Sequence, residues 1–190
     1  MNPILDRIKN NQLVPMAERF DVLVEGMSEN DALTLLLEKT SNVQRPADRY
    51  FAATRLGLSQ TEESLDVLIQ ATNNLSIDEL YDRITRRKSI EALGRRKDKR
   101  AIPSLVKVLT CTDTEAVINA ISALVRINWE PTLAEQEILV SLLDGEVTKI
   151  RAVIQAHTRL KIKNSKSSAV INDLCQHESA LVAGAARAYQ

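Results

Sequence analysis

The chain has 190 residues, of which 44% are apolar and only 3% aromatic, so it can bury a sizeable core made mainly of aliphatic side chains. Its 25 Lys and Arg residues balance 25 Asp and Glu residues, which argues against a general nucleic-acid-binding role. Cys111 and Cys175 stand alone, which argues against a disulfide framework and against a zinc site. The chain lacks a signal peptide and an apolar run of about 18 residues, so we expect a cytoplasmic protein without membrane insertion.

Amphipathic segments follow one another along the whole chain and predict helices joined by short turns. The clearest pair surrounds residues 112–114, whose side chains offer cap oxygens to the second helix, while Pro103 suits the first turn of the first helix. In chain order, the predicted helices cover residues 16–25, 30–39, 48–58, 63–72, 82–96, 103–109, 114–127, 133–143, 147–162, 167–176 and 180–188.

One helical motif recurs and defines a repeat. Its leucines are Leu56, Leu93, Leu124 and Leu160, which are 37, 31 and 36 residues apart. A period of this length marks a helical hairpin that buries its apolar face against copies of itself. The sequence therefore predicts an all-α, right-handed solenoid of HEAT-like hairpins. We expect one domain over 1–190, with N-terminal helices at 1–43, core repeats at 44–162 and a last repeat, whole or incomplete, at 163–190.

The interval 73–81 departs from the regular pattern because it separates two paired helices by more residues than the other turns do. In solenoids such an insertion is either a tolerated surface loop or part of a binding edge. The densest cationic segment, at 83–88, follows immediately. Arg83 and Arg87 lie outside the register that HEAT repeats use for structural arginines, so we regard them as candidates for ligand contact.

Several other polar or aromatic residues each allow two interpretations. Arg49 and Arg86 share the register of the structural arginines, which favours a bond within the fold over a bond to a ligand. His157 aligns with apolar residues of other repeats, which favours a packed histidine over a catalytic one. Trp129 lies at a corner between repeats, either as packing or as an anchor for a partner.

No glycine-rich phosphate loop, nucleophile elbow or metal-binding helix motif is present, which argues against an autonomous enzyme. From about residue 44 to residue 162, however, the chain resembles the E/F-type phycobiliprotein bilin lyases, HEAT-like proteins of cyanobacteria. The resemblance lies in an Asp-Arg-Tyr-Phe-Ala-Ala run at 48–53 and a doubled-Arg helix with Ala-Leu-Gly at 84–94. It continues through the segments 100–103, 109–113 and 116–120, in the order found in the family.

The resemblance implies a subunit of a bilin lyase or lyase-isomerase that works with a second HEAT-like subunit and a phycobiliprotein subunit. A phycobilin would be the substrate, with no metal and no other cofactor. Its two propionates need cations, its protonated pyrroles need a carboxylate, and its rings need an aromatic neighbour. The expected substrate-binding residues are Arg83 and Arg87 for the first need, Asp78, Glu79 or Asp82 for the second, and Tyr81 for the third. The alternative is a non-enzymatic HEAT scaffold or chaperone that binds phycobiliprotein subunits or another protein.

Overall fold

The computed structural model describes residues 22–38 and 47–190, and no residue in these two ranges belongs to a β-strand. The chain divides into two compact units, Met1–Arg96 and Lys97–Gln190. The first contains α3 (Glu29–Leu37), α4 (Asp48–Leu56), α5 (Glu62–Asn74) and α6 (Leu80–Arg96). The second contains η2 (Lys99–Ala101), α7 (Ile102–Val108), α8 (Thr114–Arg126), α9 (Leu133–Ser141), α10 (Val147–Leu160), α11 (Ser165–Asp173), η3 (Leu174–Gln176) and α12 (Ala180–Tyr189).

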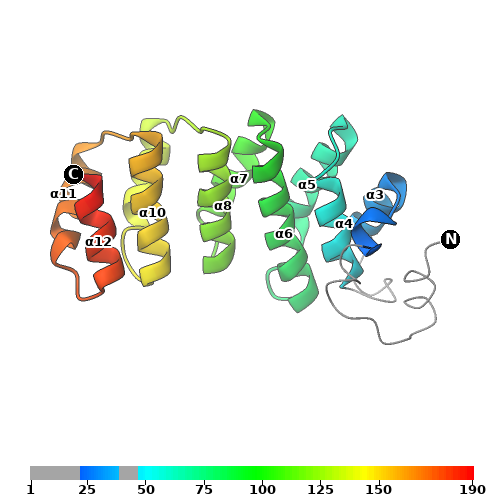
Figure 1. Ribbon diagram of the computed structural model, residues 1–190, viewed down its shortest axis with the longest axis horizontal. Coiled ribbons are helices and arrows are strands. Elements are labelled where there is room, and N and C mark those ends of the chain that lie inside the picture. The colour runs from blue at the N-terminus through cyan, green and yellow to red at the C-terminus, as the bar shows by residue number, and fades with distance from the viewer. Residues whose placement is uncertain (1–21, 39–46) are drawn as a thin grey trace. The chain divides into compact units, whose positions relative to one another are not determined.

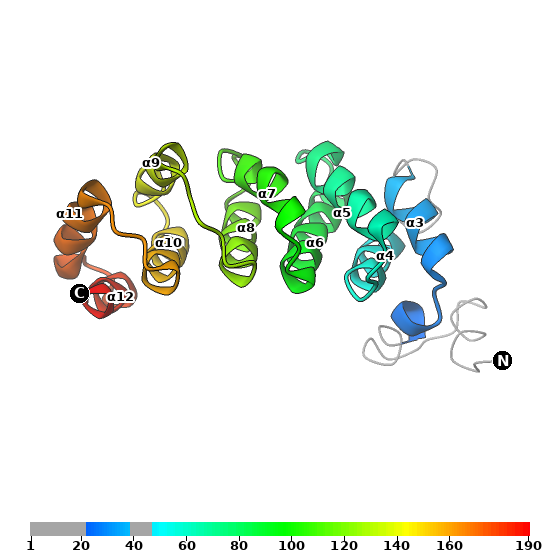
Figure 2. The ribbon, with the colours of Figure 1, turned by 90° about the horizontal axis from the view of Figure 1, so that it is seen from above.

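Within each unit the helices form two layers of antiparallel hairpins. In the first unit α3 and α5 form one layer and α4 and α6 the other; in the second, α7, α9 and α11 lie opposite α8, α10 and α12 (Figures 1 and 2). The predicted all-α class with HEAT-like hairpins is therefore confirmed. The predicted helix over 16–25 lies largely outside the described residues.

Small residues occupy equivalent positions in the second helices α4, α6, α8 and α10. Ala52, Ser89 and Ala120 are completely buried and Ala156 is 2% exposed, as their equivalent positions in the repeat predict. The recurring leucines Leu56, Leu93 and Leu124 are also completely buried, whereas Leu160 is half-buried. The repeat motif thus marks the core-facing side of each second helix.

Local signals account for several helix ends. The Thr61 hydroxyl accepts a hydrogen bond from the backbone N–H of Ser64 at the start of α5, and Asp113 accepts one from Ala116 at the start of α8. At the end of α8, Asn128 adopts a left-handed conformation and the N–H of Trp129 donates to the carbonyl of Leu124 at 3.0 Å. Trp129 is only 4% exposed, so the packing interpretation is confirmed.

Gly57 directly follows α4, at a close contact with α6. A Cβ atom at position 57 would lie 2.8 Å from the Ala92 Cβ and 3.2 Å from the Ala92 Cα. The backbone of Gly57 has φ −64°, a value open to any residue, so glycine is required here for space and not for backbone freedom.

We predict that Gly57→Ala lowers the free energy of unfolding by about 1–3 kcal/mol, because the added methyl must displace the α6 backbone. Gly184→Ala in α12 is the matched control, since nothing lies within 4 Å of the Cβ position there. The control should stabilise the protein by up to about 1 kcal/mol through helix propensity. Urea unfolding followed by circular dichroism measures both changes, and equal effects would contradict the proposed close contact.

Candidate functional site

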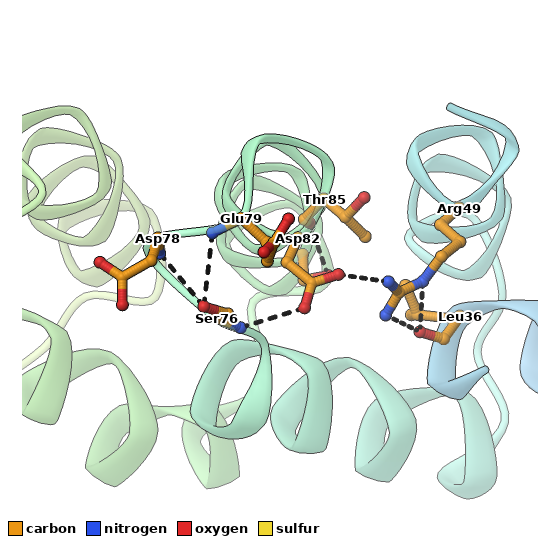
Figure 3. Close-up of polar contacts among 8 residues, drawn as sticks. Leu36, Arg49, Ser76, Asp78, Glu79, Asp82 and Thr85 are labelled. Carbon is orange, nitrogen blue, oxygen red and sulfur yellow. Dashed lines mark hydrogen bonds and ion pairs between the residues drawn. The ribbon is translucent and has the colours of Figure 1, made fainter. Parts of the chain in front are cut away.

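The turn between α5 and α6 is held by Ser76. Its hydroxyl oxygen accepts hydrogen bonds from the backbone N–H groups of Asp78 at 3.1 Å and Glu79 at 3.4 Å (Figure 3). The side chains of Asp78 and Glu79 are exposed. The long interval expected at 73–81 is in fact shortened, because α5 extends to Asn74 and α6 begins at Leu80. The two carboxylates therefore project from a short, ordered turn.

Asp82 is directed toward Arg49 and the backbone of the α5–α6 turn. Its Oδ1 lies 2.5 Å from Arg49 Nη1, and its Oδ2 accepts a hydrogen bond from the backbone N–H of Ser76 at 3.3 Å (Figure 3). Arg49, only 1% exposed, also donates from Nε and Nη2 to the carbonyl of Leu36, at 3.3 and 3.0 Å. Asp82 and Arg49 thus connect the α5–α6 turn to the end of α3. A cavity of about 330 Å³ borders this ion pair.

The structural interpretation of both register arginines is confirmed. Arg49 bonds to an acidic residue of the next repeat, as the register predicts. Arg86 is 8% exposed and donates from Nε to the carbonyl of Thr72 in α5 at 2.8 Å. Each arginine therefore joins a second helix to the end of a first helix.

An exposed apolar patch occupies the start of α6. It consists of Leu80, Tyr81 and Ile84, which are 51%, 44% and 37% exposed. Because side chains three and four residues apart lie on the same side of a helix, Ile84 adjoins both of the others. We call these three residues the α6 patch. The sequence had indicated Tyr81 alone, although Leu80 and Ile84 stand four residues apart in a segment that is otherwise strongly charged.

Two arginines border the α6 patch. Arg83 and Arg87 are both half-buried, and Arg83 donates from Nη1 to the carbonyl of Ile77 at 3.4 Å. Arg83 follows Leu80 by three residues, and Arg87 follows Ile84 by three, so both arginine side chains leave the helix beside the patch. The structure therefore brings Tyr81, Arg83 and Arg87 to one region of α6, close to the turn that carries Asp78 and Glu79.

A second charged group continues along α6, and the sequence had not indicated it. Lys88, 7% exposed, places Nζ 4.9 Å from the ring centroid of Tyr50 in α4 and 2.9 Å from Glu91 Oε2. The other oxygen of Glu91, Oε1, accepts a hydrogen bond from Arg95 Nη2. Burial alone would raise the pKa of Glu91, but the hydrogen bonds and charges of Lys88 and Arg95 outweigh it and lower that pKa. The Glu91 carboxylate is therefore held ionised between two cations.

His157, in α10, is packed within the core of the second unit. It is completely buried, and its Nδ1 lies 3.0 Å from the carbonyl of Val153. A carbonyl only accepts, so the proton is on Nδ1 and Nε2 carries the lone pair. Nε2 has no hydrogen-bond partner among the described residues. Burial lowers the pKa of His157 and outweighs the opposing effect of the bond to Val153. The predicted packing role is confirmed.

We predict that His157 makes the protein less stable in mild acid. Below pH 6.5, the ordinary value for histidine, the unfolded chain takes up a proton that the folded chain refuses. The free energy of unfolding should therefore decrease as the pH is lowered, by up to about 1.4 kcal/mol per pH unit. His157→Ile, which inserts the residue found at the equivalent positions 90 and 121, should remove this dependence. Urea midpoints at pH 7.5 and pH 5.5 test the effect, with His177→Gln as the control that should keep the pH dependence. If His157→Ile loses as much stability between these two pH values as His177→Gln does, the prediction is wrong.

Residues 22–38 and 47–190 meet neither the requirements of a metal site nor those of a membrane-spanning helix. No group of three or more His, Cys, Asp or Glu side chains is placed there to hold a metal ion. None of the helices in the same ranges combines the length and apolar character that a membrane crossing requires.

Comparisons with known proteins identify helical-repeat relatives. Residues 75–158 match the family model of HEAT repeats. Over 138 residues the chain is 30% identical to the "uncharacterized phycocyanin operon protein Y" of Pseudanabaena tenuis; the match covers 73% of this chain and 32% of that protein. The chain thus spans about one third of the length of its curated relative.

Solved structures share the fold. The complex of CpcE and CpcF of phycocyanin lyase from Nostoc sp. matches with a TM-score of 0.67 and 23% identity, over 86% of this chain and 64% of that one. A designed armadillo repeat protein in complex with the peptide (KR)4 matches with a TM-score of 0.64 and 16% identity, over 90% of this chain and 84% of that one. Both similarities lie in the arrangement of the helices and therefore show a shared fold alone.

Proposed function

Because this chain belongs to the HEAT-like phycobilisome lyase family, we propose that it is a subunit of a phycobiliprotein bilin lyase or lyase-isomerase. In this role it binds a linear tetrapyrrole in the cytoplasm and orients it for attachment to a cysteine of a phycobiliprotein. The thioether forms on the acceptor protein, so this chain need only hold the bilin in a productive orientation and limit its access to water. No metal or further cofactor takes part.

The α6 patch is the observation that supports this proposal most directly. A bilin is a long conjugated molecule with apolar faces and two propionate groups. Leu80, Tyr81 and Ile84 offer apolar area of the kind that a pyrrole ring covers, and Tyr81 can stack on it. Arg83 and Arg87, beside the patch, are suited to the propionates because guanidinium groups bind carboxylates with two hydrogen bonds.

The carboxylate that meets the protonated pyrroles is Asp78 or Glu79 in this proposal. Both side chains are exposed on the turn that leads into α6. Asp82 is the third residue expected for this role, but one of its oxygens pairs with Arg49 and the other accepts a hydrogen bond from the Ser76 N–H. We therefore assign Asp82 to positioning the turn.

The proposed partners are a second HEAT-like subunit and the phycobiliprotein that accepts the bilin. The structural relative from Nostoc sp. is a complex of two different chains, which supports a two-subunit arrangement. The partner subunit would complete the enclosure of the bilin, because an exposed helix face does not exclude water from its ligand.

Absorbance spectroscopy with phycocyanobilin and phycoerythrobilin tests the proposal. We expect the free-bilin spectrum to shift when this chain is added, and to shift further when the partner subunit is present. Attachment is then measured as zinc-enhanced fluorescence of the acceptor subunit after denaturing electrophoresis. Unchanged bilin spectra, with the chain alone and with its partner, would rule out the bilin-binding role.

A scaffold or chaperone role is the second candidate, because the same apolar patch also suits an amphipathic segment of a protein. The armadillo relative, in complex with a peptide, is a helical-repeat protein of similar fold that holds a peptide. Recovery of phycobiliprotein subunits by the immobilised chain, without bilin transfer in the coupled assay, would favour this role over the lyase.

A further inference from the structure

We infer that Lys88 and Arg95 form a second carboxylate-binding subsite on α6, and that the side chain of Glu91 occupies this subsite in the free protein. Glu91 would then set how strongly this face of α6 binds anionic ligands. The choice of a bilin as the natural ligand rests on the proposed function, whereas the subsite itself rests on the geometry of these three residues.

The Glu91 carboxylate shows how such a subsite holds an anion. One oxygen faces Lys88 Nζ at 2.9 Å and the other accepts from the Arg95 guanidinium. The exposed fractions of these side chains rise from 7% for Lys88 to 37% for Glu91 and 38% for Arg95, so the group is open to solvent at one end. An incoming carboxylate can therefore reach the Arg95 end without displacing the fold.

The subsite lies on the same side of α6 as the apolar patch. Glu91 follows Ile84 by seven residues, two turns of helix, and Lys88 follows Ile84 by four. At about 1.5 Å per residue, Glu91 is roughly 10 Å along the helix from Ile84. A flat ligand that covers the patch can therefore bring one acidic group to Arg95, while Arg87, eight residues and roughly 12 Å before it along the helix, holds the other.

Charge explains why Glu91 matters for selectivity. The group carries two positive charges and one negative charge, and the lowered pKa of Glu91 keeps that carboxylate ionised at neutral pH. A ligand carboxylate that approaches Arg95 must compete with Glu91 and is repelled by it. A neutral ligand meets no such competition. Removing the charge of Glu91 should therefore favour acidic ligands over neutral ones.

The test compares a diacid ligand with its neutral form. Biliverdin and biliverdin dimethyl ester share the tetrapyrrole and differ at the two propionates. We expect Glu91→Gln, measured by absorbance titration of the full chain, to lower the Kd of biliverdin about three- to fivefold and to change that of the ester less than twofold. Arg95→Gln should weaken biliverdin binding and leave the ester unchanged. Glutamine retains a hydrogen-bond acceptor for Lys88, and thermal melting checks that each variant is folded.

The matched control is Glu63→Gln, which removes an exposed carboxylate from α5, in the other layer of the same unit. It should change neither affinity. If wild-type protein binds biliverdin but Glu91→Gln leaves its Kd unchanged or raises it, the subsite is refuted while the proposed function stands.

If wild-type protein binds no bilin, the proposed function fails, and the subsite is then tested with a different pair of probes. The fluorescent anion 8-anilinonaphthalene-1-sulfonate and the uncharged N-phenyl-1-naphthylamine provide the same comparison of charged and neutral ligands. Glu91→Gln should then tighten binding of the sulfonate alone, and equal affinities in the variant and the wild type would refute the subsite.

Discussion

Arg49→Met is expected to lower the free energy of unfolding by about 3–5 kcal/mol, the largest stability effect that we predict. Arg49 is almost completely buried, and its guanidinium meets both the Asp82 carboxylate and the Leu36 carbonyl. Methionine fills a similar volume but leaves a carboxylate without its cation and a carbonyl without its donors. The cost of the variant is thus mainly the desolvation of groups that lose their partners.

Urea unfolding measures this loss, and a double variant identifies its cause. If the loss of the cation beside Asp82 dominates, Arg49→Met combined with Asp82→Leu should recover part of the stability lost in the single variant. Arg126→Met, which replaces an exposed arginine in α8, is the control and should change the stability by less than about 0.5 kcal/mol. A loss below about 1 kcal/mol for Arg49→Met would contradict the central role of this ion pair.

The double variant Leu80→Glu/Ile84→Glu is expected to weaken bilin binding at least about thirtyfold, equivalent to about 2 kcal/mol. Both residues lie in the α6 patch, where the proposed ligand covers them. The new carboxylates would lose hydration beneath an apolar ring and would repel the propionates. Because the two wild-type side chains are 51% and 37% exposed, the free energy of unfolding should change much less than the affinity.

Absorbance titration with phycocyanobilin measures this affinity, and thermal melting monitors the fold. Leu133→Glu/Leu181→Glu is the matched control, since it replaces two other exposed leucines, 77% and 58% exposed, in the second unit. Normal bilin affinity in the α6 variant would place the binding site elsewhere. Equal losses in both variants would indicate a general effect of added negative charge.

The sequence by itself determined the helical hairpins and the register of their core. Both follow from short-range chemistry, since apolar spacing, cap residues and small residues act within one or two turns of helix. For the same reason the structural roles of Arg49 and Arg86 were predictable from their positions in the repeat. The predicted boundaries of α6 were less accurate, because the Ser76 hydroxyl orders the preceding turn and the helix begins at Leu80, two residues earlier than expected.

Only the tertiary structure decided which charged and apolar side chains of α6 are accessible. Leu80 and Leu93 are both apolar residues of one helix, yet one is 51% exposed and the other completely buried, because neighbouring helices cover only one side of α6. Asp82 and Glu91 are likewise both acidic, but Asp82 pairs with an arginine 33 residues earlier in the chain, whereas Glu91 bridges two cations of its own helix. Local sequence patterns do not specify such long-range pairings, since these depend on how successive repeats pack.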